Sequence, residues 1–561
     1  MNVRKVERTP SAYPYPLLIR HLLRTPLTYS PGREIVYQDA VRHDYRTLDT
    51  RVRRLAQALE RLGVGPGDTV GIMDRDSHRY LEAFLAVPIM GAVLHTINVR
   101  RSAEDLVKTI GHAGETVILA HGDFFDLLTP VARRLDRPFR VVAMTDGAPV
   151  SDPAPDAGLT VAGEYEALLA AESGDFEFPD FEEDAAAAMF HAAGAAGGPR
   201  GLAFSHRQLV THVYGVMAGL SGFGFEPSVS ATDVYMPLSP MFHVNAWGLF
   251  YLFTLLGAKQ VYPGNADPET ILRMVDREGV TFSHTDPTLL HTLVNHPAAR
   301  EVNLSGWKVI VGGAPLSESL CRAALELGIS PFSVYGMAET GSLLTCAALK
   351  PHMKAWPEDR QVAVRCRTGL PAPMVDLEIL DAMGNPLPHD GHSVGEVVVR
   401  TPWISQGYLD QPEASERLWA DGWLHTGDIG TIDAGGYLQI TDRYKGAIKS
   451  GGEWIASQAL ETLLCEHEGV VEAAVTAVPD ETLGETPLAL VVLKPAFRGT
   501  VDEAELRRFC EERAAAGKIP ATGVPDKIAI VETIPKTSLG KVTRRGMLQG
   551  FEEEFDVKGG P

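Results

Sequence analysis

The chain has 561 residues, which is too long for one compact core, so we expect at least two domains. Hydrophobic residues make up 45% and charged residues 22%, as in ordinary globular proteins, and this excludes wholesale disorder. The formal net charge of −21 repels polyanions, so we expect no nucleic-acid partner.

The cysteines are odd in number and show neither a CxxC pattern nor a Cys/His ligand spacing. We therefore expect buried free thiols in place of disulfides or a zinc site at Cys321, Cys346, Cys366, Cys465 and Cys510. The N-terminal apolar run is short and interrupted by charges, and no stretch of about 18 apolar residues occurs elsewhere. The pattern predicts no signal peptide, no membrane span and a cytoplasmic location.

Helical and strand-like segments alternate through the first half of the chain. Apolar residues recur at helical spacing over 45–63, 78–90 and 102–113, and the strand-like runs TVGIMD, GAVLHTIN, TVILAH and VVAM lie between or after them. This alternation predicts a parallel, wound α/β sheet. Residues 147–185 are typical of a loop and a surface helix, and a second α/β run is expected over 186–340.

The second half has a different texture. Short strands with Gly, Pro and Asp turns over 360–440 predict a β-rich subdomain. Helices over 457–467 and 502–515, with the strands AAVTAVP, PLALVVL and KIAIVE, predict a small α+β domain. We therefore divide the α/β chain into a large domain, residues 1–442, and a small C-terminal domain, residues 443–561.

One glycine-rich run, MFHAAGAAGGPRGLAFSHRQL, has a composition that can bind phosphate. Glycines such as Gly194 and Gly197 let backbone N–H groups approach a phosphate closely, and Arg200 adds a positive charge. The Walker pattern G-x-x-x-x-G-K-[ST] is absent. By itself the run is more typical of an ordinary turn, and only the motifs that accompany it change that interpretation.

Six further motifs follow in order: SPMFHVNAW, VIVGGAPL, YGMAET, WLHTGDIG, DRYKGAIKSGGEWI and PKTSLGKVTRR. In order and spacing they resemble the adenylate-forming superfamily of acyl-CoA synthetases, luciferases and peptide-synthetase adenylation domains, over essentially the whole chain. The phrases PMFHVNAW, LGAKQV, EGVTF and IKSGGEWI are most similar to bacterial medium- and long-chain fatty acyl-CoA synthetases.

The resemblance implies that the chain binds ATP, Mg²⁺ and a carboxylic acid, and uses coenzyme A as co-substrate. A carboxylate oxygen would attack the α-phosphorus, pyrophosphate would leave, and a nucleophile would then attack the adenylate. Such chemistry depends on positioning and charge neutralisation. It implies that Asp428 holds the ribose hydroxyls, that Arg443 contacts the ribose and phosphate region, and that Glu339 holds magnesium.

Further roles follow from the same resemblance. It implies that Gly312, Gly313 and Ala314 form a strand end that flanks adenine and that Tyr335 packs on the base. Gly336 and Met337 would also bind ATP. Lys541 would bridge the α-phosphate and the attacking carboxylate. Lys445 would be the hinge of a rotating small domain, whose other face would line the coenzyme A path at Lys449, Gly451, Gly452 and Trp454. His243 and Trp247 would lie between the acyl pocket and the nucleotide, with Trp247 as a gate.

Each of these residues also has an ordinary structural explanation. Alone, Asp428 would be a turn aspartate and Tyr335 a core aromatic. Single Lys, Arg and Glu residues are usually solvated. For His243 and Trp247 the alternative is that both are core residues at the start of a helix.

The sequence departs from the family pattern in its phosphate loop. Alanines stand where hydroxyl residues are usual, Arg200 replaces a lysine, Ala338 replaces the Thr before Glu339, and Gly446 replaces an Asp. A hydrogen bond to a charged group is worth about 1.5–3 kcal/mol, so we expect weaker ATP binding or a slower first step. Arginine can hold phosphate by two parallel bonds but does not reproduce a hydroxyl's geometry.

Three hypotheses remain open at this point. The first is an acyl-CoA synthetase for an apolar acid. The second keeps the adenylation step but uses an amine, another nitrogen nucleophile or a carrier-protein thiol. The third is a catalytically impaired protein that binds a nucleotide or an acyl ligand. The resemblance also admits a homodimer.

Replacing Ala195 and Ala196 by Thr should tighten ATP binding, because it restores hydroxyl donors to phosphate. The measurement is the ATP Michaelis constant of the double variant against the wild type. An unchanged constant would show that backbone N–H groups alone hold the phosphates.

Overall fold

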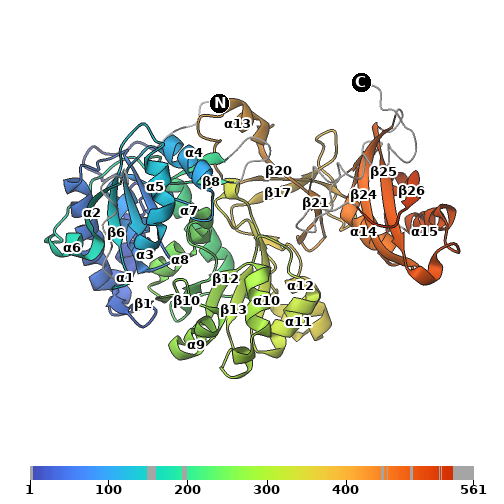
Figure 1. The fold of residues 1–561 in the computed structure, drawn as a ribbon, viewed down its shortest axis with the longest axis horizontal. Coiled ribbons are helices and arrows are strands. Elements are labelled where there is room, and N and C mark those ends of the chain that lie inside the picture. The colour runs from blue at the N-terminus through green and yellow to red at the C-terminus, as the bar shows by residue number, and fades with distance from the viewer. Residues whose placement is uncertain are drawn as a thin grey trace. The chain divides into compact units, whose positions relative to one another are not determined.

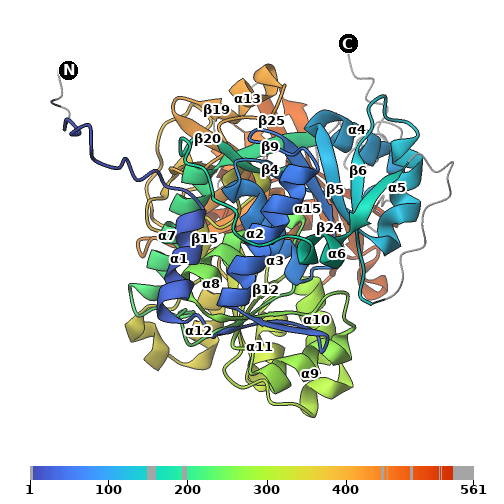
Figure 2. The ribbon, with the colours of Figure 1, turned by 90° about the vertical axis from the view of Figure 1, so that its left-hand side faces the viewer.

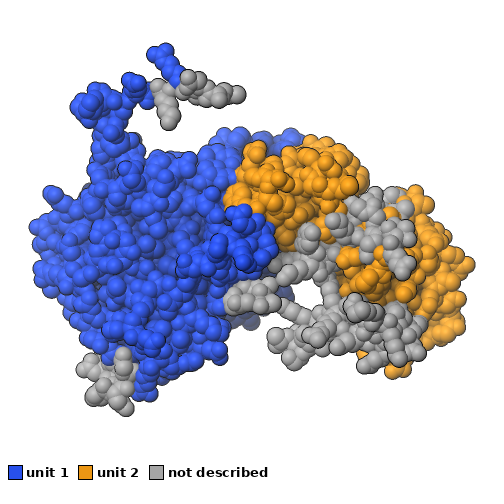
Figure 3. All heavy atoms as spheres, turned by 90° about the horizontal axis from the view of Figure 1, so that it is seen from above, with its two compact units in different colours: residues 1–366, 372–374, 401–417 blue, residues 367–371, 375–400, 418–561 orange. Residues whose placement is uncertain are grey.

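The computed structural model describes residues 4, 6–147, 159–192, 199–443, 448–450, 453–480, 484–516, 518–519 and 521–534. Its internal contacts divide the chain into two units (Figure 3). Unit 1 comprises Met1–Cys366, Ala372–Met374 and Thr401–Arg417, and unit 2 comprises Arg367–Pro371, Val375–Arg400 and Leu418–Pro561. Most of the predicted β-rich segment is thus grouped with the C-terminal part, and the domain boundary expected between residues 442 and 443 stays a prediction.

The first sheet of unit 1 confirms the predicted wound α/β pattern. Its strand order is β7-β6-β5-β3-β4-β8-β9, parallel except for the last pair. Its strands are β3 (Thr69–Met73), β4 (Val93–Thr96), β5 (Glu115–His121), β6 (Arg140–Met144), β7 (Thr160–Glu164), β8 (Ala186–Ala192) and β9 (Arg200–Ser205). The helices among these strands are α2 (Tyr45–Arg61), α3 (His78–Ile89), α4 (Ala103–Ala113), α5 (Phe125–Ala132), α6 (Tyr165–Ala170) and α7 (His206–Ser221).

This sheet is covered by helices whose ends match the sequence signals. Figure 2 shows α4 and α5 beside β5 and β6. Helix α4 begins after the Ser102 cap and ends at Gly114, whose φ of +80° suits glycine. Strand β7 was not expected, because it is short and only half-buried.

The second sheet of unit 1 has the order β15-β14-β13-β12-β10-β11-β1-β2. Its strands are β1 (Glu34–Tyr37), β2 (Val41–Asp44), β10 (Val234–Pro237), β11 (Lys259–Tyr262), β12 (Phe282–Thr285), β13 (Lys308–Val311), β14 (Ser330–Tyr335) and β15 (Thr345–Cys346). Strands β10 to β14 run parallel, and β13 is continuously apolar after its first residue because both faces are covered. Figure 1 shows α10 and α11 beside β13.

The remaining helices of unit 1 are α1 (Arg20–Tyr29), α8 (Leu249–Leu256), α9 (Pro268–Glu278), α10 (Pro287–Asn295), α11 (Glu318–Glu326), α12 (Glu358–Arg365) and most of α13 (Pro412–Leu418). The apolar sides of α9, α10 and α11 pack on the second sheet around Leu272, Leu290 and Val309, which are fully buried. Helices α12 and α13 lie in the segment predicted to be β-rich. The rest of that segment consists of short strands joined by turns and loops.

Unit 2 holds two sheets. The first has β17 (Asp376–Leu380), β18 (Gly395–Arg400), β20 (Trp423–Ile432) and β19 (Trp419–Ala420) in that order, with β21 (Leu438–Arg443) on β20. The second has β23 (Glu453–Ile455), β22 (Ile448–Ser450), β25 (Gly484–Leu493) and β24 (Val470–Asp480), with β26 (Lys527–Ile530) on β25. Helices α14 (Ser457–Cys465) and α15 (Glu503–Ala515) pack on it, and this confirms the predicted α+β pattern.

Short elements complete the described chain. They are η1 (Gly122–Phe124), η2 (His243–Gly248), η3 (Pro297–Arg300), η4 (Ala338–Thr340), η5 (Pro351–Ala355), η6 (Pro495–Phe497), η7 (Ala521–Gly523) and β16 (Leu370–Pro371). No helix among the described residues has both the length and the apolarity to cross a membrane. The five cysteines are free, as predicted. Cys321 and Cys510 are buried, whereas Cys465 is exposed, contrary to expectation.

Candidate functional site

The carboxyl ends of β13 and β14 bring together the residues predicted for adenine. The two strands are parallel neighbours, with Val311 opposite Ser333. Gly312, Gly313 and Ala314 directly follow β13, and Tyr335 ends β14. Carboxyl ends of adjacent parallel strands are where open α/β sheets bind ligands. The sheet register therefore makes one edge from two motifs separated in sequence.

The loop after β14 folds back on itself so closely that only glycine fits at its start. A Cβ added to Gly336 would lie 1.4 Å from the Ser342 carbonyl oxygen. The Thr340 hydroxyl accepts from the Met337 N–H at 3.0 Å and contacts the Ser342 carbonyl at 3.1 Å. These contacts hold the η4 turn, and with it the backbone of Glu339, at the sheet edge.

Trp247 covers the same edge from a strained turn. A Cβ on Gly312 would lie 2.9 Å from the Trp247 ring, so glycine is what lets the indole approach the strand end. The indole is 7% exposed and lies against His284, with 4.8 Å between ring centroids. The Ser342 hydroxyl donates to the Trp247 carbonyl at 2.9 Å. The indole of Trp247, the predicted gate, therefore packs against the end of β13, where adenine is predicted to bind.

The backbone of this turn is left-handed over four consecutive residues without glycine. Val244, Asn245, Ala246 and Trp247 have φ values of 47°, 49°, 48° and 56°. Such a conformation costs roughly 1–2 kcal/mol per residue, and strain of this kind concentrates at functional sites. The alternative of core residues at a helix start is therefore only partly right: Trp247 is buried, but the turn before α8 is not an ordinary helix start.

His243 begins the same turn, but its side chain is exposed. Desolvation and the nearby Arg100 lower the pKa of His243 from its usual value. The structure therefore associates Trp247 with the strand edge and leaves His243 at the surface of the unit. A direct role for His243 stays a prediction.

Glu339 and Arg200 meet through Tyr408, which the sequence analysis missed. The Tyr408 hydroxyl donates to the Glu339 carboxylate at 2.6 Å. The Arg200 guanidinium lies over the Tyr408 ring, 4.7 Å from its centroid. Burial and Glu339 raise the pKa of Tyr408 to about 12, so the phenol remains a donor at neutral pH. The Ser405 N–H also donates to the Glu339 carbonyl at 2.9 Å.

The contacts of Glu339 fit its predicted use as a magnesium ligand. One carboxylate oxygen accepts from Tyr408, and the other has no hydrogen bond to any described residue. Magnesium is usually held by one or two carboxylates together with substrate phosphates. Glu339 would hold the ion with its second oxygen, and the ion would neutralise phosphate charge. The signal for Tyr408 in the sequence is the SQGYLD run, which has no distinctive composition.

In unit 2, antiparallel pairing joins the two residues predicted for the ribose. Asp428 on β20 lies opposite Arg443 on β21. Asp428 is 5% exposed, and its N–H donates to the Thr426 hydroxyl at 3.1 Å. The same kind of pairing places Lys449 opposite Trp454, which is buried and packs with Ile429. Whether these two residues line a coenzyme A path stays a prediction.

Several predicted residues lie outside the described part of the chain: Gly194, Gly197, Lys445, Gly451, Gly452 and Lys541. Those residues predicted to bind the nucleotide that the structure describes are divided between the two units. Those at the β13 and β14 edge, with Arg200 and Glu339, belong to unit 1, and Asp428 and Arg443 belong to unit 2.

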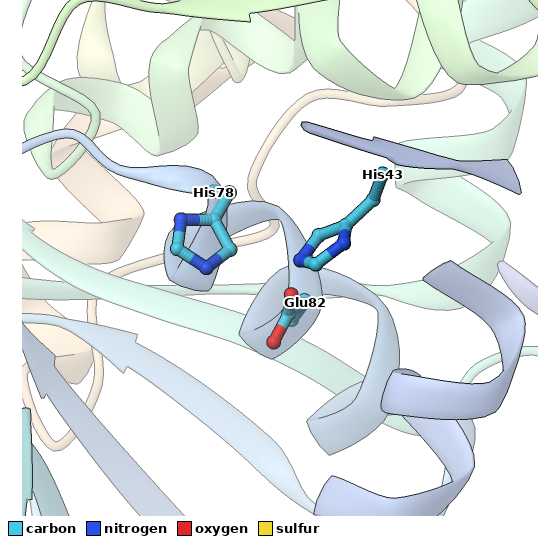
Figure 4. Close-up of side chains that lie close together, drawn as sticks. All are labelled: His43, His78 and Glu82. Atoms are coloured by element: carbon cyan, nitrogen blue, oxygen red, sulfur yellow. The ribbon is translucent and has the colours of Figure 1, made fainter. Parts of the chain in front are cut away.

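A separate group, His43, His78 and Glu82, has the residue types of a metal site (Figure 4). Both ring nitrogens of His78 are buried without a partner among the described residues. However, both Glu82 oxygens accept from Arg51, at 2.6 and 3.1 Å, and one also accepts from the Tyr165 hydroxyl. A metal cation at this group would lie beside the positively charged Arg51 guanidinium, which would repel it. We therefore interpret the group as an Arg51–Glu82 ion pair packed against two neutral histidines.

Comparison with known proteins decides the family. Residues 24–409 match the model for AMP-binding enzymes, and residues 459–541 match that for the AMP-binding enzyme C-terminal domain. The chain belongs to the AMP-binding enzyme family. The chain is 37% identical to a long-chain-fatty-acid–CoA ligase of Thermus thermophilus over 517 residues. The alignment covers 92% of this chain and 91% of that protein. The chain is 35% identical to a 3-methylmercaptopropionyl-CoA ligase of Ruegeria lacuscaerulensis over 548 residues, covering 96% and 98%.

Solved structures agree with the adenylate-forming fold of this family member. A fatty acyl CoA synthetase of Mycobacterium tuberculosis matches with a TM-score of 0.73 at 23% identity, over 96% of this chain and 99% of that one. The amide bond synthetase McbA from Marinactinospora thermotolerans matches with a TM-score of 0.64 at 26% identity, over 95% and 99%.

The Tyr408→Phe variant should raise the ATP Michaelis constant by about tenfold, because a hydrogen bond to a charged group is worth about 1.5–3 kcal/mol. The ring that Arg200 covers remains, so thermal stability should change little. Tyr214→Phe, at an exposed site on α7, is the control. An ATP Michaelis constant equal to that of the control would show that Tyr408 does not position Glu339.

Proposed function

We propose that this chain is an AMP-forming acyl-CoA synthetase. An apolar carboxylic acid and ATP would give an acyl-adenylate and pyrophosphate, and coenzyme A would then give the thioester and AMP. The observation that carries the proposal is the match over nine-tenths of both chains to a long-chain-fatty-acid–CoA ligase. The proposal includes a cytoplasmic location and leaves a homodimer open.

The unit 1 residues have contacts suited to the nucleotide end of this reaction. We assign adenine to the β13 and β14 ends, next to Gly313, where an added Cβ would have no atom within 4 Å and the space is therefore open. Arg200 supplies positive charge for the phosphates, and Glu339 supplies an oxygen for magnesium. The first step needs negative charge to be neutralised as it develops at the α-phosphate.

The unit 2 residues are assigned to the sugar and to the second step. Asp428 can accept from both ribose hydroxyls, and Arg443 lies opposite it on the neighbouring strand. We assign the hinge between the two domains to Lys445. We assign to Lys541 the stabilisation of the negative charge that develops in the first transition state. The coenzyme A path is assigned to the hairpin that contains Lys449, Gly451, Gly452 and Trp454.

The acyl group is assigned to the apolar side of the Trp247 turn. Val244 and Ala246 in this turn, and Phe250 and Phe253 on α8, are buried. Apolar surroundings of this kind favour an apolar acid over a charged one, because burying an unpaired charge is costly. The relatives named for long-chain and medium-chain fatty acids support the same class.

A second candidate changes only the acceptor. The amide bond synthetase McbA shares the fold at 26% identity, which supports an amine as nucleophile. The alanine-rich phosphate loop is a further departure that suits a specialised role. Adenylation would be the same in both candidates, so the product identifies the acceptor.

Product mass after incubation with ATP, Mg²⁺ and a straight-chain fatty acid tests the proposal, with coenzyme A, an amine or neither added. We expect the acyl-CoA mass only when coenzyme A is present. Formation of an amide with the amine, and no thioester with coenzyme A, would overturn the proposal in favour of the second candidate.

The Lys541→Ala variant separates the two steps. It should suppress adenylate formation by at least about a hundredfold, because a positive charge that stabilises the transition state is worth several kcal/mol. Thioester formation from a supplied acyl-adenylate and coenzyme A should be close to wild type. Equal loss in both steps would contradict the role assigned to Lys541.

A further inference from the structure

Three histidines of unit 1 form a continuous hydrogen-bonded chain between two carboxylates. His95 on β4 bonds to Glu115 through Nδ1, and its Nε2 lies 3.0 Å from Nδ1 of His191 on β8. Nε2 of His191 lies 2.9 Å from Nδ1 of His112 on α4. Nε2 of His112 lies 3.0 Å from the Asp410 carboxylate. All six ring nitrogens are thereby used.

The number of protons in this chain follows from its hydrogen bonds. Each of the four bonds needs one proton between its two heavy atoms, whereas three neutral imidazoles supply only three. Two ionised carboxylates supply none. The complete chain therefore holds one proton more than three neutral histidines, whether that proton makes one ring an imidazolium or protonates one carboxyl.

The two ends of the chain differ in their access to water. Glu115 is fully buried, and Arg137 lies 3.5 Å from its carboxylate and donates to its carbonyl. Asp410 is 87% exposed, and His112 is 27% exposed. The extra proton can therefore exchange with solvent only at the Asp410 end.

The middle ring does not hold the extra proton. Burial lowers the pKa of His191 to about 2, with further lowering from His95, His112 and Arg101. Arg101 also donates to the His191 carbonyl at 3.0 Å. Burial thus disfavours an imidazolium at the middle ring, and we expect the extra proton toward one end of the chain or the other.

The solvent end of the chain holds the segment that carries Tyr408. Asp410 lies two residues beyond Tyr408, and the Leu409 N–H between them donates to the Gly201 carbonyl at 2.9 Å. A Cβ on Gly201 would lie 2.8 Å from the His112 ring, so glycine makes room for that histidine. Tyr408 in turn contacts Glu339 and Arg200. The His112–Asp410 bond thus fastens the segment next to both residues.

We propose that His95, His191 and His112 form a proton-linked latch that positions Tyr408 and Glu339 by holding Asp410. When the extra proton leaves, one of the four bonds must break. The His112–Asp410 bond is the one where water can replace the lost partner. The latch is therefore closed at low pH and opens as pH rises. Its effect on ATP depends on the proposed function, whereas its protonation does not.

Substitution at Asp410 tests the proton count. Its φ of +54° is left-handed, which Asn and Gly both adopt readily, so neither variant adds backbone strain. In the Asp410→Asn variant the new side-chain amide can donate to His112, and the four bonds are then complete with three neutral rings. Asp410→Asn should therefore keep the latch closed at every pH, and Asp410→Gly should leave it open.

The experiment measures the affinity of the full-length protein for Mg²⁺–ATP by calorimetry between pH 6 and 9. Wild-type affinity should fall by about five- to tenfold as pH rises, within the usual range of coupling between sites. The Asp410→Asn variant should keep, across this pH range, the tight Mg²⁺–ATP affinity that the wild type has at pH 6. The Asp410→Gly variant should keep the weak affinity that the wild type has at pH 9. Asp359→Asn removes one negative charge at an exposed site of the same unit and serves as the control. Its Mg²⁺–ATP affinity should show the same pH dependence as that of the wild type. An equal pH dependence in wild type and Asp410→Asn would overturn the latch.

NMR of protein labelled at the histidine nitrogens and at the Asp and Glu carboxyl carbons reads the chain without reference to ATP. The wild type should show the uptake of one proton by the three rings and the two carboxylates together, and Asp410→Asn should show none. Rings and carboxylates that take up no proton in the wild type would overturn the proton count. If the rings titrate while no variant binds ATP, the proposed function fails, and the coupling to ATP fails with it.

Discussion

The parallel pairing of β13 with β14 is the constraint on which the site depends. It places Gly312 and the loop from Gly336 to Ser342 at one edge, although the two motifs are separated by a helix. Two close approaches then shape that edge: the loop carbonyl against Gly336 and the indole of Trp247 against Gly312. Any side chain at either glycine would push apart the groups that form the edge. Backbone geometry, more than side-chain chemistry, thus shapes the edge to which we assign the nucleotide.

Charge at this edge is organised by one phenol. Tyr408 accepts the Arg200 guanidinium on its ring face and donates its hydroxyl to Glu339, so a cation and an anion are held without neutralising each other directly. That arrangement suits a ligand that brings both phosphate and a metal ion. The segment carrying Tyr408 is itself fastened to η4 by the Ser405 N–H and to β9 through Leu409. Glu339 is therefore positioned from two sides.

The alternating elements could be predicted from sequence because their apolar periodicity is local. The expected helix over 45–63 is α2, and the expected strands TVILAH and KIAIVE are β5 and β26. Three features could not be predicted because they depend on distant partners. Strand β1 pairs with β11, Tyr408 meets Glu339, and His95 reaches Asp410 only through two other rings. The left-handed turn at Trp247 also lacks the glycines that usually signal one. The roles of Lys541 and Lys445 were inferred from motif resemblance alone and stay predictions.

The central claim is that the unit 1 edge activates a carboxylic acid with ATP. The most direct measurement is the exchange of labelled pyrophosphate into ATP, with Mg²⁺ and a series of straight-chain fatty acids, in the absence of any acceptor. We expect exchange that depends on the acid and that Glu339→Gln reduces strongly at unchanged thermal stability. Persistent ATP binding without exchange for any acid would contradict it and would identify the chain as a nucleotide-binding protein without ligase activity.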